Sequence, residues 1–291
     1  MDGILVVNKP LGKTSFDMVA QTRREFHTKK VGHIGTLDPM ASGVLPILIG
    51  SCTKLSDYLM DHDKDYVAII KLGKSTNTGD QEGEVVEEVE VDKSILEETK
   101  VEEVLNSFLG ESEQIPPMYS AIKINGKKLY ELARAGQTVE RKPRKIYISN
   151  IQLLNIGKEE NEIKFKVTCS KGTYIRTLCE DIAKKLGTIG YMTELTRTRV
   201  GEFNIEDEGK VISLEELLSK NPSKELDDNE YRKLSNGIML EFDNTASSEA
   251  SSNLDCFVKL YHNKEFIGAA KIEKNNKIQR FILKENEKGE E

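Results

Sequence analysis

The order of apolar segments along this chain most constrains what it can fold into. Segments with alternating apolar residues, typical of strands, are mixed with segments of helical spacing, and the helices do not follow every strand as in parallel βαβ units. We therefore expect an α+β fold with a mixed, largely antiparallel central sheet and flanking helices. The predicted strands are residues 3–7, 44–49, 66–72, 119–124, 145–155, 163–170 and 192–200, and the predicted helices are about 15–27, 94–108, 129–135, 174–186 and 213–218.

Two side-chain patterns within these elements make specific predictions. Helical spacing gives the first helix an inner face of five residues: Phe16, Val19, Ala20, Arg23 and Phe26. Alternation along residues 192–200 places Leu195, Arg197 and Arg199 together on one face of a strand.

A smaller unit is expected after Asn221-Pro222-Ser223, whose composition is typical of a linker. Residues 1–225 would form the main domain, and residues 226–291 a small β-rich module. Short predicted strands at 257–261, 266–272 and 278–283 follow a serine-rich loop at 246–253. The charged tail after Lys284 has the composition of a disordered segment.

Composition excludes several classes of protein. No run approaches the roughly 18 apolar residues of a membrane span, and the N-terminal residues lack the basic region of an export signal. The histidines are scattered, and the four cysteines form no C-x-x-C pair: Cys52, Cys169, Cys179 and Cys256. We therefore expect reduced thiols, a cytoplasmic protein and no metal site.

The net charge of −7 is unevenly distributed. Residues 119–146 hold eight Lys/Arg and two Glu, and residues 164–199 hold eight Lys/Arg and three Asp/Glu. Residues 82–113 hold twelve acids and two Lys, and residues 202–230 hold ten acids and three Lys. The acidic runs are read as solvated faces. Local patches of one sign decide phosphate binding, so the basic segments are candidates for contact with a nucleic acid.

The segment from Val31 to Gly43 is rich in Gly and Pro and contains a candidate catalytic carboxylate. Asp38 precedes a proline, which restrains it toward extended backbone. Gly32, Gly35 and Gly43 allow the chain to approach a ligand closely. From local sequence alone, an Asx turn in an ordinary loop is the favoured explanation of Asp38.

The segment Gly32-His-Ile-Gly-Thr-Leu-Asp-Pro-Met-Ala-Ser-Gly43 closely resembles the active-site motif of the TruB family of tRNA pseudouridine synthases. Coverage is roughly residues 1–220, and a weaker match, residues 227–283 with Leu234-Ser-Asn-Gly237, resembles a PUA-type RNA-binding module. Further family-like segments follow in the family's order: Gly3–Pro10 with Lys13-Thr14-Ser15, Lys64-Asp65-Tyr66, Gln114–Ala121, Lys171-Gly-Thr-Tyr-Ile-Arg-Thr-Leu178 and Glu194–Phe203.

This resemblance implies that Asp38 is the catalytic carboxylate, acting as a nucleophile or by removing a sugar proton; the sequence leaves that order open. It implies that Arg176 pairs with Asp38 and holds it ionised. The alternative for Arg176 is a surface pair with Glu180, four residues later on the same helix.

The resemblance also assigns four residues around the base. Tyr66 would stack on the uracil and remove a proton, and Tyr174 would line the pocket. Leu195 would close the pocket, and His33 would fill the gap left by flipped nucleotides. For both tyrosines and the leucine the alternative is ordinary core packing. His33 has no second His or Cys at ligand spacing, so a metal role is not expected.

An insertion at about residues 119–146 is similar to the family's segment that grips the RNA stem-loop. Phosphate and shape contacts there would offset the few kcal/mol that base extrusion costs. The alternative is a flexible charged loop. The expected RNA-binding residues are Lys123, Lys127, Lys128, Arg134, Arg141 and Arg144, together with Arg197 and Arg199 on the strand.

The resemblance implies an enzyme that isomerises uridine to pseudouridine at position 55 in the T-loop of tRNA. It would use no cofactor and no metal, and would act as a monomer without a protein partner. Two rivals are a non-catalytic RNA-binding protein of the same fold and a guide-RNA-dependent relative acting on ribosomal RNA. The presence of Asp38, Tyr66 and Arg176 argues against the first. The long basic insertion and the lack of a lysine-rich tail argue against the second.

Overall fold

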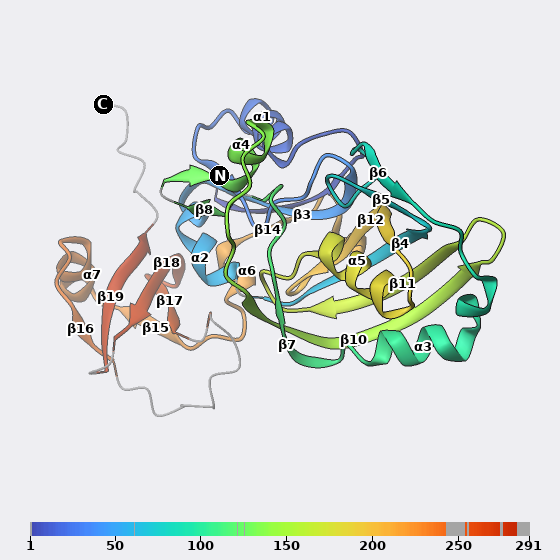
Figure 1. The fold of residues 1–291 in the computed structure, drawn as a ribbon. Coiled ribbons are helices and arrows are strands. Elements are labelled where there is room, and N and C mark those ends of the chain that lie inside the picture. Colours follow the sequence, from blue (N-terminus) through green and yellow to red (C-terminus); the bar gives the residue numbers. More distant parts are fainter. Residues whose placement is uncertain are drawn as a thin grey trace.

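A computed structural model describes residues 2–60, 62–120, 122–124, 126–242, 254, 256–273 and 276–283. The larger of its two main sheets has ten strands, and the smaller has five (Figure 1). The main path of the large sheet runs β14 (Val211–Ile212), β1 (Gly3–Lys9), β3 (Ala41–Ile49), β12 (Gly190–Val200), β4 (Lys64–Leu72), β11 (Glu162–Cys169), β10 (Arg144–Gly157) and β7 (Gly110–Gln114). Off this path, β2 (Val31–His33) pairs with β3, and β13 (Phe203–Asn204) pairs with β12.

Every pairing in the large sheet is antiparallel except that of β3 with β12. The predicted fold class, a mixed and largely antiparallel sheet with helices, is therefore confirmed. The segment predicted to be irregular contains β2 and the start of β3, because Val31 is buried and pairs with Ile49. The strand expected at 119–124 is reduced to β8 (Lys123–Ile124), which pairs with β9 (Lys127–Lys128).

Three longer helices cover the large sheet: α1 (Ser15–Glu25), α3 (Glu98–Asn106) and α5 (Ile175–Lys185). Figure 1 shows α3 beside β10 and α5 beside β12. The shorter helices of the main domain are η1 (Gly50–Leu55), α2 (Ser56–Leu59), η2 (Lys93–Leu96), α4 (Leu129–Arg134), η3 (Ile205–Asp207) and α6 (Leu214–Leu217). A separate hairpin is formed by β5 (Lys74–Thr76) and β6 (Val85–Glu88).

Helix α1 begins at a capping box, in which Thr14 and Asp17 satisfy each other's backbone amides. Its buried face consists of Ser15, Met18, Val19 and Thr22. The predicted inner face is wrong for Phe16, which is 63% exposed. The hydroxyl of Ser15 is drawn inward by hydrogen bonds to the backbone of Leu37, and this rotates the helix by about one residue.

Alternation along the strands divides the apolar residues between two cores on opposite faces of the sheet. On β1, Leu5 belongs to a core shared with α1, α3 and α5, whereas Ile4 and Val6 belong to a second core. That second core also contains Phe257 and Ile282 of the C-terminal module, so the module packs directly on the main sheet.

The C-terminal module has the strand order β15 (Ser223–Leu226), β17 (Phe257–His262), β18 (Glu265–Ile272), β19 (Lys277–Leu283) and β16 (Leu240–Glu241), with α7 (Asp228–Ser235) against it. The chain enters this sheet at Ser223, through the parallel pairing of β15 with β17. The predicted serine-rich loop and charged tail lie outside the described residues. Within the described part of the chain, no helix combines the length and apolar character needed to cross a membrane.

Candidate active site

A cavity of about 380 Å³ opens beside the parallel junction of β3 and β12. Five of the residues expected at the site lie around it: Asp38, Tyr66, Tyr174, Arg176 and Leu195. They come from the β2–β3 loop, β4, the start of α5 and β12, so segments far apart in sequence build one site.

The loop that carries Asp38 is held by the segment from the end of β1 to the start of α1, through one side chain and one backbone amide. The Ser15 hydroxyl donates to the Leu37 carbonyl at 3.1 Å and accepts from the Leu37 amide at 2.8 Å. The Gly12 amide donates to the Pro39 carbonyl at 2.8 Å. The Asp38 side chain itself is 42% exposed, so a substrate can reach the carboxylate.

Lys9 is a buried cation beneath the same loop, and sequence reasoning missed it as a site residue. Its Nζ donates to the carbonyls of Pro10 at 3.0 Å and Lys13 at 2.6 Å, and at 3.5 Å to the carbonyl of Pro39, which follows Asp38. Burial lowers the pKa of Lys9, and the nearby Asp38 carboxylate opposes that shift. Lys9 thus ties the loops around Asp38 together and adds positive charge near the carboxylate.

Arg176 joins Asp38 to a second carboxylate that sequence reasoning did not select. Its Nη2 lies 3.1 Å from Asp38 Oδ2, and its Nη1 lies 3.3 Å from Asp80 Oδ2. The guanidinium also donates to the carbonyls of Thr78 at 3.1 Å and Tyr119 at 2.6 Å. The expected contact with Asp38 is therefore present in the structure, in place of a surface pair with Glu180.

Helix polarity explains why Arg176 needs two carboxylates. It lies in the first turn of α5, where the helix dipole disfavours a positive charge. Its side chain is only 8% exposed, and the Asp80 side chain is 6% exposed. Asp80 also accepts hydrogen bonds from the Thr78 hydroxyl at 2.6 Å and the Glu82 amide at 3.1 Å, which fix its orientation.

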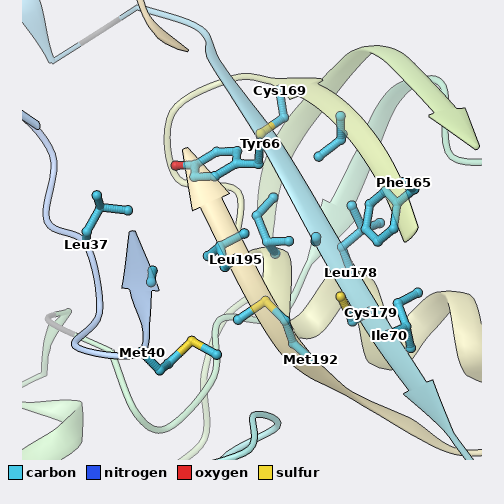
Figure 2. Close-up of a cluster of buried hydrophobic side chains, with 14 of the residues drawn as sticks. Leu37, Met40, Tyr66, Ile70, Phe165, Cys169, Leu178, Cys179, Met192 and Leu195 are labelled. Atoms are coloured by element: carbon cyan, nitrogen blue, oxygen red, sulfur yellow. The ribbon is translucent and has the colours of Figure 1, made fainter. Parts of the chain in front are cut away.

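Tyr66 belongs to both the core and the cavity. It is 8% exposed and packs in the large hydrophobic cluster, yet it also lines the site. Figure 2 shows its hydroxyl pointing out of that cluster toward the loop that carries Leu37. Burial raises the pKa of Tyr66. Leu195, on the neighbouring strand, is likewise a core residue and a cavity residue.

Tyr174 is positioned through its backbone by Gln114. The Gln114 side chain donates to the Tyr174 carbonyl at 3.0 Å and accepts from its amide at 2.8 Å. Gln114 is 4% exposed and ends β7, so this clamp connects the edge of the sheet to the start of α5. Burial raises the pKa of the Tyr174 phenol.

The alternation of β12 placed Arg197 on the face of Leu195 correctly, since both line the cavity, but it was wrong for Arg199. Arg197 is 1% exposed and lines the cavity, so it cannot serve as a surface contact for RNA phosphates. A bulge between Arg197 and Arg199 shifts the register, so that Arg197 faces Tyr66 and Arg199 faces Asp65. Arg199 Nη2 donates to Asp65 Oδ1 at 2.7 Å, and the two arginines lie on opposite faces.

Two glycines of the motif are required by this arrangement. Gly43 has φ +107°, and a Cβ there would lie 2.1 Å from the Arg197 carbonyl oxygen. Gly35 has φ +74°, and its carbonyl accepts from Arg197 Nη2 at 3.0 Å. The motif glycines therefore allow β3 and the loop that carries Asp38 to approach β12.

His33 lies on β2 and is half-buried. Burial lowers its pKa, and the charge of Arg197 acts in the same direction, so the ring is neutral at neutral pH. The structure does not bring it into the lining of the cavity that holds Asp38. Among the described residues no group of three or more His, Cys, Asp or Glu is placed to hold a metal ion.

The basic insertion contacts the site through its backbone and presents cations at its surface. Lys123, Lys127, Arg134 and Arg144 are exposed. Lys128 hydrogen-bonds to the Tyr130 hydroxyl at 3.2 Å, and Arg141 donates to the Pro116 carbonyl at 3.0 Å. A second cavity of about 290 Å³ lies among these residues.

Comparison with known proteins agrees with this geometry. Residues 23–175 match the TruB family pseudouridylate synthase (N-terminal domain), and residues 176–238 match the tRNA pseudouridylate synthase B C-terminal domain. The chain is 45% identical over 288 residues to tRNA pseudouridine synthase B of Clostridium kluyveri, covering 91% of this chain and 97% of that relative. It is 46% identical over 260 residues to the Bacillus subtilis protein of the same name, covering 83% and 84%.

Solved structures show the same fold. The crystal structure of a Cbf5-Nop10-Gar1 complex superposes with a TM-score of 0.62 at 24% identity, covering 92% of this chain and 78% of that chain. The two family-model matches and the relatives named above show that the chain is a pseudouridine synthase. Within that class, the chain belongs to the TruB family.

Proposed function

We propose that this protein isomerises uridine to pseudouridine at position 55 in the T-loop of tRNA, with Asp38 as the catalytic carboxylate. The observation that carries the proposal is the Asp38–Arg176 pair, 3.1 Å apart, at a cavity lined by Tyr66, Tyr174 and Leu195. The named relatives at 45–46% identity support tRNA as the substrate in preference to ribosomal RNA selected by a guide.

The reaction breaks the bond between the ribose C1′ and uracil N1, turns the base, and joins C1′ to C5. Atoms and electrons balance without an oxidant or a cofactor. The guanidinium of Arg176 favours the ionised form of Asp38, which the carboxylate needs either to attack the sugar or to remove a proton from it. Tyr66 and Leu195 would hold the base, and Tyr174 would lie beside the sugar.

The binding partners follow from the surface charge. The exposed cations of the insertion would contact the phosphates of the T-arm, and the C-terminal module would add affinity from the acceptor-stem side. We propose that the protein acts as a monomer, in the cytoplasm, without a protein partner. Cys52, Cys169 and Cys179 are buried free thiols.

The test is conversion of unmodified tRNA that carries tritium at uracil C5. Wild-type protein should release tritium and form pseudouridine at position 55, both in whole tRNA and in an isolated T-arm stem-loop without a guide RNA. Asp38→Asn should lower turnover by about four orders of magnitude or more, while tRNA binding measured by filter retention stays near wild type. An Asn variant that turns over near the wild-type rate would show that Asp38 is not the catalytic group.

A further inference from the structure

Arg197 is a buried cation with no carboxylate within ion-pair distance among the residues that the structure describes, unlike Arg176 and Arg199. Its Nε donates to the Val44 carbonyl at 2.8 Å, and its Nη2 donates to the Gly35 carbonyl at 3.0 Å. An isolated charge buried in this way is costly unless something compensates it. Hydrogen bonds to two neutral carbonyl oxygens offset only part of the cost of burying the charge of Arg197.

The group that faces Arg197 is the phenol of Tyr66. The two residues are direct partners across the pairing of β12 with β4, and both line the cavity. The charge of Arg197 lowers the pKa of Tyr66, and Tyr66 raises the pKa of Arg197. Arginine has only donors, so the phenol oxygen is the acceptor in any contact between the two. The guanidinium can therefore hold that oxygen and leave the O–H to face the cavity.

Three charged or titratable groups from neighbouring segments act on the Tyr66 phenol: Arg197 from β12, Cys169 from β11 and Asp38 from the catalytic loop. Burial raises the pKa of Tyr66, and Cys169 and Asp38 act in the same direction. Arg197 opposes them through its positive charge. Removing Arg197 would therefore raise the pKa of Tyr66 further.

Building on the proposed function, we propose that Arg197 is the positioning residue for the Tyr66 hydroxyl in the step that removes the proton from C5 of the rotated base. It holds the phenol oxygen at the cavity and stabilises negative charge on it.

The step balances as follows. A Tyr66 phenolate, formed by loss of the phenol proton to solvent, takes the proton on C5 after the C1′–C5 bond has formed. The electron pair of the C5–H bond forms the C5=C6 double bond and displaces the C6=N1 pair onto N1. N1 takes a proton from solvent, and Tyr66 returns as the phenol.

The experiment measures single-turnover rates on T-arm RNA with hydrogen or deuterium at uracil C5. Arg197→Met should lower the rate about a hundredfold or more and increase the isotope effect, because C5 proton removal becomes the slow step. Its rate should keep rising to a higher pH than that of wild type. Arg197→Lys, which retains a cation, should react about tenfold or more faster than Arg197→Met.

A double-mutant cycle separates this role from a structural one. In the Tyr66→Phe background, Arg197→Met should change the rate no more than about threefold, because the hydroxyl on which Arg197 acts is gone. If Arg197→Met lowers the rate in the Tyr66→Phe background as much as it does in wild type, and leaves the isotope effect unchanged, the proposal is overturned. If the melting temperature of Arg197→Met is too low for the assay, Arg197→Gln takes its place in the cycle, because glutamine keeps a hydrogen-bond donor without the charge. Failure of wild type to make pseudouridine would refute the proposed function instead.

Discussion

At the scale of single residues, one guanidinium holds two carboxylates of the site at similar distances. Asp80 is 4% exposed and fixed by its own hydrogen bonds, whereas Asp38 is open to substrate. The buried carboxylate therefore fixes Arg176, and Arg176 in turn aims Asp38. Asp80 does not line the cavity in which Asp38 lies, so we infer that it acts on the proposed reaction through Arg176.

We predict that Asp80→Asn lowers the single-turnover rate by about ten- to a hundredfold with little change in tRNA affinity. Asparagine keeps the volume but loses the charge that holds the guanidinium, and small misplacements of a catalytic group are costly. Rapid-quench kinetics and filter binding give the two quantities.

The matched control is Asp65→Asn. Asp65 also pairs with an arginine, Arg199 at 2.7 Å, and its side chain is 13% exposed, but the pair lies on the other face of the strand from Tyr66. Equal losses of rate in the two variants would mean that Asp80 matters only for stability.

At the scale of elements, the single parallel pairing of the large sheet builds the site. Where β3 runs beside β12, Ala41 pairs with Leu195, and Gly43 pairs with Arg197. The loop that carries Asp38 ends at this pairing, so Asp38 lies close to the side chains of β12. A side chain at Gly43 would separate the two strands, because a Cβ would overlap the Arg197 carbonyl.

We predict that Gly43→Ala lowers the melting temperature far more than Gly110→Ala. Both positions have a left-handed backbone, with φ +107° and +94°, and should each lose about 1–2 kcal/mol from that strain. Only Gly43 adds a clash, since nothing lies within 4 Å of a Cβ at Gly110. Differential scanning calorimetry of the two variants compares them, and similar melting temperatures would contradict the role given to Gly43.

Periodic elements were predictable from sequence, whereas contacts between distant segments were not. The strand predicted at residues 66–72 is present as β4, and its alternate residues Tyr66, Ala68, Ile70 and Leu72 are buried, because each residue's side is set by the strand itself. The bulge that turns Arg199 away from Arg197 leaves no mark in an alternating pattern. Lys9 and Asp80 were missed because their roles depend on partners that are separated from them in sequence.

Family resemblance, not periodicity, selected Asp38, Arg176 and Tyr66, and the structure brings these three to one cavity. The rotation of α1 relative to its predicted inner face shows what helical spacing alone cannot predict. A polar residue, Ser15, lies inside because it bonds to the loop backbone, and Phe16 is thereby left at the surface. Such a preference follows from a tertiary contact and cannot be read from the apolar pattern.

At the scale of the whole molecule, the C-terminal module is joined to the main domain through a shared core. Tyr58 of α2 packs edge-on against Phe257 at 4.9 Å and against Phe281 at 5.6 Å. Met60 and Lys64, a few residues beyond Tyr58, line the active-site cavity. Truncation after Ser223 would therefore expose apolar residues of the main domain as well as remove the proposed RNA contact.

We predict that Phe257→Ala loosens the main domain and that Val258→Ala does not. The two neighbours on β17 are both fully buried, but Phe257 belongs to the shared core and Val258 to the module's own core. Loss of the phenyl ring should cost about 3–5 kcal/mol. Hydrogen exchange at residues 50–59 should accelerate in the Phe257 variant alone. Equal exchange in both would show that the shared core does not support the main domain.

The two-sided burial of β1 also limits which insertions and deletions the gene can tolerate. Because Leu5 faces the helices while Ile4 and Val6 face the module, shifting the strand by one residue would exchange the contents of the two cores. Strand β10, whose alternate residues Tyr147 and Ser149 are exposed, contributes to one core only. The side-chain positions along β1 are therefore fixed by two cores at once, and length changes in this protein should be excluded from β1.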